Sequence, residues 1–379
     1  MKIDQSIVDT YENKYTGMVQ YQMEQTRSAL DPFVTVISDA QGELYRLPTT
    51  VGSTELNRLQ SRYQEAVPEE LEFGQRWMSQ SYFEKFLHWS TIDPDFMVNL
   101  PLNATLFVKA LGEAVQRAKD YEVLGTVRDM NPESPTYKHV IVREVDTLYN
   151  DAVDGSPYKG GSTGGFFGDN YCGKRGEQKV SLPQQPLLVN GTAPIETYTQ
   201  FTKGSQLDYE KSNVVPVNFS STGTASLSGL TLDKLMAIGE MAMSRHMEGE
   251  LIMAITPKQV SDLRREEKLQ KQDYGFQSLR TGWVQELFGI KFVVTPAVPI
   301  VNAGTTAAPR WVRACPVWRK SDLWYGTWAN SQFHMRPPVG KNINEMLVGV
   351  TMGIGAARTR EESCISVHCD EGLTIGQSS

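Results

Sequence analysis

The stretch from Asn103 to Leu124, NATLFVKALGEAVQRAKDYEVL, carries the strongest helical pattern in this sequence of 379 residues. Apolar side chains recur there at spacings of three and four, and they define one face made of Leu106, Ala110, Leu111, Ala114, Val115 and Ala118. Gly125 follows as the expected C-terminal cap. At 1.5 Å per residue such a helix is about 33 Å long. We therefore expect it to be the backbone of a domain, with this face packed on strands from 311–369.

The C-terminal half predicts the strands and shorter helices that would surround this helix. Thr231 is a good N-cap for a helix to about His246, and Thr256-Pro257 begins a second helix. Strands are predicted at 251–255, 287–294, 311–315, 323–327, 333–336, 346–357 and 364–369. Glycines within 346–357 indicate that another backbone comes close to this strand.

The N-terminal region predicts segments that reach beyond the subunit. Residues 33–38 and 43–47 are expected to pair as a hairpin, because 39–42 supplies turn residues. Such a hairpin is marginal alone, and the polar stretch 49–64 offers little apolar surface. We expect an arm that lies on a neighbouring subunit, anchored by Leu44, Tyr45 and Leu47.

The first thirty residues predict an amphipathic helix over 4–30. Its apolar stripe is narrow and consists of Val8, Tyr11, Tyr15 and Met18. Such a stripe suits a helix that rests on a neighbouring subunit, and it equally suits a terminal helix on its own domain. Both interpretations stay open.

Composition and charge exclude several classes of protein. The net charge of −7 is acidic, whereas a protein that wraps nucleic acid tightly shows a basic surplus. The acidic surplus therefore argues against tight wrapping of DNA. No run approaches the roughly 18–20 apolar residues of a membrane span, so no membrane is expected. Four cysteines are too few for a disulfide framework in a chain of this length.

Three motifs resemble functional sites without completing one. Residues 168–175 nearly match a phosphate-binding loop, but Arg175 stands where a hydroxyl residue is needed. Cys364, His368 and Cys369 resemble a metal cluster, yet His368 and Cys369 face opposite sides of a strand. The tryptophans in the β-rich end favour core packing over base stacking: Trp311, Trp318, Trp324 and Trp328. We predict no catalytic, cofactor-binding or metal-binding residue, and hence no enzyme.

Two stretches, together about half the chain, carry a resemblance to a known family. The first runs from Ile92-Asp93-Pro94 through Ala110-Leu111-Gly112-Glu113-Ala114 to Leu124-Gly125. The second comprises 229–235, 256–263, 288–292, 353–358 with Glu361-Glu362, and Cys369-Asp370-Glu371. In order and spacing these elements resemble the tailed-phage major capsid proteins of the HK97-type fold. The bulky 126–228 insertion departs from simpler members, and we match no residues of the self-crosslinking chemistry of some relatives.

The resemblance implies an α+β fold: an HK97-like coat subunit with an N-terminal arm, an extended hairpin (E-loop), a peripheral domain with a long spine helix, and an axial domain. The implied ranges are 1–30 for the arm, 31–99 for the extended hairpin loop and its lead-in, 100–126 with 311–371 for the peripheral domain, 127–310 for the axial domain with its insertion, and 372–379 for the tail.

The resemblance also implies the function of a structural protein of the virion. The chain would self-assemble in the host cytoplasm into hexamers and pentamers of an icosahedral phage head around double-stranded DNA. Scaffolding, portal and decoration proteins are the implied further partners. Glycines near Gly125 and Gly326 would act as hinges. The alternatives are an encapsulin-like shell around a protein cargo and an unrecognised nucleotide-binding enzyme.

Overall fold

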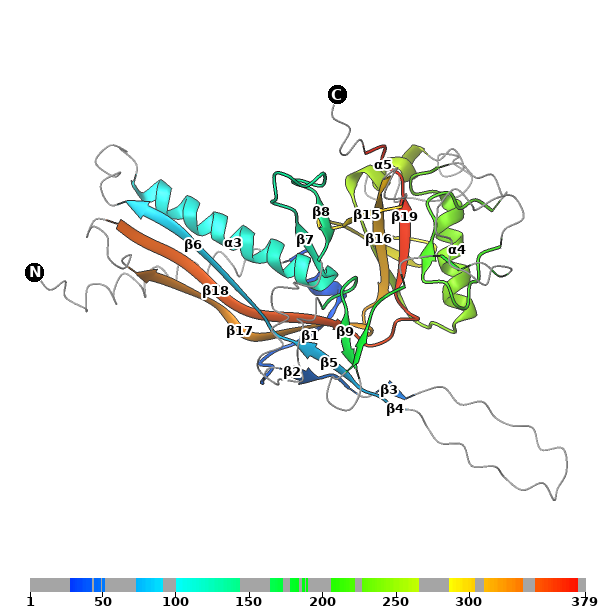
Figure 1. Cartoon of the computed structure of the whole chain (residues 1–379), viewed down its shortest axis with the longest axis horizontal. Helices are drawn as coiled ribbons and strands as arrows, with labels where there is room; N and C mark the ends of the chain where they lie inside the picture. Colours follow the sequence, from blue (N-terminus) through cyan, green and yellow to red (C-terminus); the bar gives the residue numbers. More distant parts are fainter. Residues whose placement is uncertain are drawn as a thin grey trace, which may run out of the picture.

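The structure is a computed structural model that describes residues 28–42, 44–48, 50–51, 73–90, 100–143, 164–172, 178–183, 186–187, 189, 206–221, 227–265, 286–303, 310–336 and 345–373. It contains an elongated body, built on a long sheet and one long helix, and a more compact body built on a second sheet (Figure 1). The predicted helix over 4–30 falls almost entirely outside the described residues. No helix in the described part is long and apolar enough to cross a membrane.

The elongated body consists of a four-stranded sheet covered on one side by helix α3 (Figure 1). The strand order is β1 (Thr35–Ile37), β17 (Leu323–Arg336), β18 (Glu345–Arg358) and β6 (Ser81–Ser90). Helix α3 spans Leu100–Leu124 and packs mainly on β18. The predicted long helix is therefore confirmed and begins three residues earlier than expected. The strands expected at 323–327 and 333–336 form one strand, β17, with two register irregularities.

The compact body is built on a nine-stranded mixed sheet that buries the largest apolar cluster. Its main path is β13 (Glu286–Leu287), β14 (Ile290–Val294), β12 (Leu251–Ile255), β16 (Trp311–Arg319), β15 (Ile300–Asn302), β8 (Val140–Val142) and β7 (Thr126–Arg128). Strand β19 (Ile365–Cys369) pairs with β16 and with β11 (Val214–Val215). The range 311–371, expected in one domain, thus spans both sheets.

Two short helices of the compact body begin at the predicted caps. Helix α4 (Leu232–Ser244) follows Thr231, whose side chain accepts a hydrogen bond from the backbone N–H of Lys234. Helix α5 (Pro257–Arg265) has proline in its first position. In Figure 1, α4 lies on the side of the nine-stranded sheet farthest from α3.

The hairpin predicted over 33–47 is wrong, although both of its strands form. A short 3-10 helix, η1 (Asp31–Phe33), leads into β1, which pairs in parallel with β17. Strand β2 (Leu44–Arg46) pairs instead with β5 (Arg76–Ser79). The physical reason is that the turn chemistry of 39–42 acts only locally, whereas pairing with distant strands lets Ile37 and Tyr45 pack partly buried on the cluster of Leu47, Met78 and Ala357.

The strands on the two sides of the extended loop, its limbs, therefore differ from the predicted hairpin. Its two sides are β2 followed by β3 (Thr50–Val51), and β4 (Phe73–Gly74) followed by β5. On its other edge β5 pairs with β9 (Asn170–Cys172), and β9 pairs with β10 (Gln178–Val180). The polar stretch predicted over 49–64 lies mostly outside the described residues. The described limbs place the loop base against the end of the long sheet (Figure 1).

Candidate assembly site at the base of the extended loop

Strand β5 crosses the long sheet at two glycines. A Cβ atom at Gly355 of β18 would collide with the backbone carbonyl oxygen of Ser79, and one at Gly326 of β17 would collide with Met78. The predicted close approach of another backbone to the 346–357 strand is therefore confirmed. Gly326 was expected to act as a hinge, but its role here is to leave room for the buried Met78 side chain.

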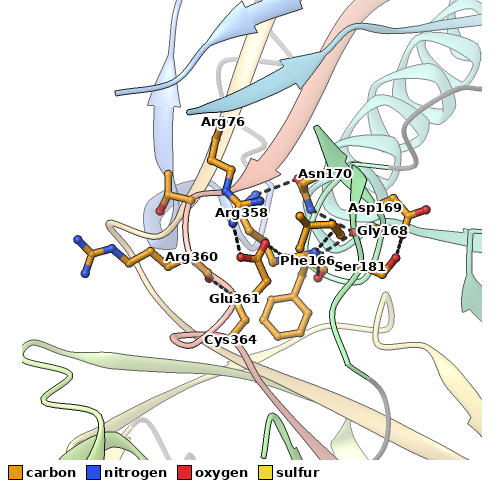
Figure 2. Close-up of polar contacts among 12 residues, drawn as sticks. Arg76, Phe166, Gly168, Asp169, Asn170, Ser181, Arg358, Arg360, Glu361 and Cys364 are labelled. Atoms are coloured by element: carbon orange, nitrogen blue, oxygen red, sulfur yellow. Dashed lines mark hydrogen bonds and ion pairs between the residues drawn. The ribbon is translucent and has the colours of Figure 1, made fainter. Parts of the chain in front are cut away.

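Arg358, the last residue of β18, is the polar centre of this crossing (Figure 2). Its side chain is fully buried. One guanidinium nitrogen, Nη1, donates to the carbonyl oxygens of Gly165 at 3.1 Å and Gly168 at 2.7 Å, and also to that of Phe166. The other, Nη2, donates to the carbonyl oxygen of Val180 at 3.2 Å. Burial lowers the pKa of Arg358, and the carbonyl oxygens replace the water that the cation loses.

An ion pair joins the base of the loop to this centre. Arg76 of β5 contacts the carboxylate of Glu361, which lies in the turn between β18 and β19 (Figure 2). The two side chains are only 14% and 18% exposed, so water screens them poorly. The second carboxylate oxygen of Glu361 lies 4.0 Å from Nε of Arg358. The backbone carbonyl of Glu361 accepts a hydrogen bond from Asn213 at 2.5 Å. The pair therefore fixes β5 to both bodies of the subunit.

The glycine-rich segment 164–168 wraps the end of α3 and presents its carbonyl oxygens to Arg358. Its N–H groups are used within the chain, since Gly165 donates to Ala356 at 2.8 Å and Phe166 donates to Val123 at 2.9 Å. A phosphate-binding loop needs the opposite polarity, with N–H groups pointing at the ligand. The near-match begins at the last residue of this segment; only its residues 168–172 are described, and Lys174 lies outside the described residues.

Gly125 ends α3 as predicted, but it is not free to act as a hinge. Its φ of +68° is the left-handed conformation that favours glycine. A Cβ atom there would lie 2.5 Å from the carbonyl oxygen of Gly164 and 2.8 Å from the backbone nitrogen of Gly168. The expectation of a flexible joint at Gly125 is wrong, because the glycine-rich segment packs directly on it.

The last turn of α3 holds a buried carboxylate that ties the helix to two strands. Glu122 lies 2.7 Å from Arg143 and accepts a hydrogen bond from the Ser81 hydroxyl of β6 at 3.0 Å. Burial raises the pKa of Glu122, although Arg143 opposes this shift. The end of α3, the start of β6 and the chain after β8 are thereby held together.

The three predicted arm anchors are buried to different degrees within their own subunit. Leu47 is only 1% exposed and packs in a cluster with Met78 and Ala357. The expectation that Leu47 anchors the arm on a neighbour is therefore wrong, because its own chain already covers it. Tyr45 is half-buried against the same cluster, and Leu44 is half-buried.

The predicted face of the long helix is described only in its C-terminal half. Leu111 is buried, while Ala114 and Ala118 are half-buried. The side chains of Leu106 and Ala110 lie outside the described residues. Leu111 and Ala118 belong to the packing of the main apolar cluster, which agrees with the direction expected for this face.

Sequence reasoning missed Arg76 and Glu361 as partners. One signal was present, because an arginine and an acidic residue three positions later, Arg358 and Glu361, directly follow a strand rich in glycine and alanine. A charged side chain at the end of such a strand needs an internal partner if it is buried. The sequence does not reveal that the partner of Glu361 is Arg76, which lies 285 positions earlier.

The residues that resembled a metal cluster are all buried: Cys364 lies just before β19, and the neighbours His368 and Cys369 lie within it. Burial and the nearby charge of Lys234 lower the pKa of His368 to about 3, so the ring is neutral. Cys369 interacts with Cys315 of β16, and the Cys364 thiol donates to the carbonyl of Arg360 at 3.4 Å. Among the described residues no group of three or more histidine, cysteine or acidic side chains could hold a metal.

A second buried cation secures the compact body near these cysteines. The ammonium group of Lys234 donates to the carbonyl oxygens of Ser228 at 2.9 Å, Gly229 at 2.8 Å and His368 at 2.9 Å. Burial lowers the pKa of Lys234. Because all three acceptors are backbone oxygens of the same subunit, this lysine links the start of α4 to β19.

Of the four tryptophans predicted to pack in the core, Trp318 does so, Trp324 and Trp328 pack partly buried on a small cluster, and Trp311 is half-buried. Trp318 is fully buried, and its indole N–H donates to the carbonyl of Phe33 at 3.0 Å. Trp328 donates to the carbonyl of Gly42 at 2.6 Å, and Trp324 donates to that of Ser321 at 2.7 Å. The bonds of Trp318 and Trp328 pin the segment that leads into the extended loop onto β16 and β17, whereas that of Trp324 is local to the turn between these two strands.

Comparison with solved structures places this architecture among phage capsids. The "Cyanophage Pam1 capsid asymmetric unit" is 11% identical and superimposes with a TM-score of 0.51, covering 91% of this chain and 92% of that chain. A structure from Gordonia phage Cozz is 12% identical, with a TM-score of 0.50 over 90% of this chain and 86% of that chain. At these identities the likeness shows the fold, and it confirms the predicted α+β, HK97-like class.

Comparison of the sequence itself gives two results. No curated protein matches it. The model of the family described as "Phage capsid protein" matches residues 7–139 and 193–371. These two ranges cover most of the chain and include the long helix, the limbs of the extended loop, Arg358 and Glu361. The chain therefore belongs to the phage capsid protein family.

Proposed function

We propose that copies of this chain form the hexamers and pentamers of an icosahedral phage head that encloses double-stranded DNA. As a member of the phage capsid protein family, the chain is a structural coat protein of the head shell and associates with copies of itself. The observation that supports the finer proposal is the fixed base of the extended loop, where Arg76 and Met78 are held against the end of the long sheet. No catalytic role is proposed.

The extended loop is the proposed arm between subunits. Its limbs, β2–β3 and β4–β5, are paired up to Val51 and Phe73. A loop with a rigid base presents its far end in one direction, which lowers the entropy lost when that end meets a neighbour. At about 25 cal/mol per Å² of apolar surface, a few hundred Å² of contact would supply several kcal/mol.

The two bodies of the subunit are the proposed peripheral and axial domains. The peripheral domain is the long sheet with α3, and the axial domain is the nine-stranded sheet with α4 and α5. Glu122 of α3 fastens the two bodies where they meet, through Arg143, which follows β8. This division replaces the ranges expected from the sequence, since β16 and β19 join the axial sheet.

Partners beyond the chain itself follow from the same proposal. Assembly takes place in the host cytoplasm with scaffolding and portal proteins, and a decoration protein can bind outside. The net charge of −7 favours loose contact with the packaged DNA, because a negatively charged protein neutralises few phosphates.

The decisive experiment replaces residues 52–72 by a short Gly-Ser turn that joins β3 to β4. The expected variant is a folded subunit with an almost unchanged melting temperature that forms no closed particles in electron micrographs. A control variant keeps the original loop length with a Gly-Ser composition, which separates loss of contact from loss of reach. Normal closed particles from the shortened variant would contradict the role proposed for the loop.

A further inference from the structure

The tip that connects β7 to β8 is a rigid projection with exposed apolar side chains. Met130 is 68% exposed, and Val127 and Tyr137 are also exposed. In Figure 1 the β7–β8 hairpin lies at the α3 side of the nine-stranded sheet, beside the C-terminal end of α3, and its tip points away from the long sheet. Exposed apolar side chains on a projecting element are typical of a contact with another molecule.

The tip satisfies its own polar groups and so needs no partner to hold its shape. The Asp129 carboxylate accepts from the Asn131 N–H at 2.9 Å and from the Thr136 hydroxyl at 2.6 Å. The backbone N–H of Asp129 donates to the carbonyl of His139 at 2.8 Å, and that of Lys138 donates back to Asp129 at 2.8 Å. A preorganised tip loses little conformational entropy when it binds.

The outer face of α4 offers a second exposed apolar surface. Met236 is 47% exposed and Met243 is 78% exposed. Both lie on one stripe of the helix with Glu240, because their spacings are four and three residues. A Cβ atom at Gly239 would meet nothing within 4 Å, so the helix surface is open at this position. Methionine-rich surfaces adapt their shape to a partner.

The charges around these two surfaces are complementary. The tip carries the exposed cations Arg128 and Lys138, with the Lys138 ammonium 4.9 Å from the centre of the Tyr137 ring. It also carries one exposed carboxylate, Glu133. The α4 face carries Glu240 between its methionines. Opposite charges across an interface fix its register and exclude wrong pairings.

We propose that the β7–β8 tip of one subunit packs on the α4 face of the next copy of this chain, a contact that rests on the proposed assembly into rings. A ring of identical subunits needs two different, complementary surfaces on each subunit. The tip and the α4 face meet this requirement, since they lie on opposite flanks of the compact body (Figure 1).

Paired cysteines test this contact in assembled particles. The double variant Met130→Cys, Met243→Cys is assembled and treated with a short bis-maleimide, and each single variant serves as a control. The expected result is a ladder of covalently linked multimers from the double variant only. Closed particles of the double variant without such a ladder overturn the contact and leave the shell function standing. Failure of the unaltered chain to form any particle overturns the proposed function itself.

A charge exchange decides the case in which the cysteine variant folds but does not assemble. Lys138→Glu and Glu240→Lys should each lower the yield of sedimenting particles by about tenfold. The two changes together should restore most of the yield, because the opposite charges then meet again. A double variant no better than either single variant overturns the proposal, and so do single variants with normal yields.

Discussion

Replacing Arg358 by methionine removes the guanidinium that holds the glycine-rich segment against the end of β18. Methionine has a similar length and fills much of the same volume, so the change isolates the polar contacts. Four hydrogen bonds are lost, to the carbonyl oxygens of Gly165, Phe166, Gly168 and Val180. Two of these acceptors, Gly165 and Gly168, keep a donor in the Asn170 side chain.

The loss of stability depends on which buried carbonyl oxygens are left without a hydrogen-bond donor. A hydrogen bond to a charged group contributes about 1.5–3 kcal/mol, and a buried carbonyl without a donor costs about 1–3 kcal/mol. The cost of burying the guanidinium, which the variant no longer carries, offsets part of this loss. We expect Arg358→Met to lower the free energy of unfolding by about 3–5 kcal/mol.

Urea unfolding of the unassembled subunit measures this loss directly. The matched control is Arg360→Met, which alters an exposed arginine two positions away and should change stability by less than about 0.5 kcal/mol. Assembly of Arg358→Met should also fail, because the base of the loop is no longer fixed. A loss below about 1 kcal/mol, with normal particles, would refute the view that Arg358 holds this junction together.

Three further predictions concern the core, the response to pH and the genome. Leu47→Ala should cost about 2–5 kcal/mol in the unassembled subunit because its side chain is buried at 1% exposure; an unchanged melting temperature would show that the loop strand packs elsewhere. Because burial lowers the pKa of His368 to about 3 from its ordinary 6.5, the stability it contributes is present above pH 6.5 and is lost as the pH falls from there toward 3; His368→Gln should flatten that part of the pH profile of unfolding, and an unchanged slope would count against a neutral buried ring. DNA binding by purified subunits should depend only weakly on salt, given the net charge of −7; a steep slope would indicate many phosphate contacts.

The elements that depend on local pattern were predictable from the sequence. The apolar periodicity of 103–124 gave the long helix, and Thr231 and Pro257 marked the starts of α4 and α5. The glycines of β18 correctly indicated a close backbone, although the sequence did not reveal that it belongs to β5. Each of these features depends on residues that lie close together in the sequence.

The choice of strand partners was not predictable in the same way. Residues 39–42 have turn chemistry that suits a hairpin, yet β1 pairs with β17, nearly three hundred residues away. The wrong pairing then made Leu47 look like an anchor on a neighbour, whereas its true neighbour is Met78 on the opposite limb. The Arg76–Glu361 pair and the carbonyl cage of Arg358 depend on the same distant contacts.

Electron cryo-microscopy of the purified, assembled chain tests the proposed coat function. We expect a closed icosahedral shell in which the loop between β3 and β4 leaves its own subunit and lies on the next. We also expect that Arg76, Arg358 and Glu361 stay within one subunit in every copy. A preparation that contains only small soluble oligomers, or a shell whose loops fold back on their own subunits, would contradict this proposal.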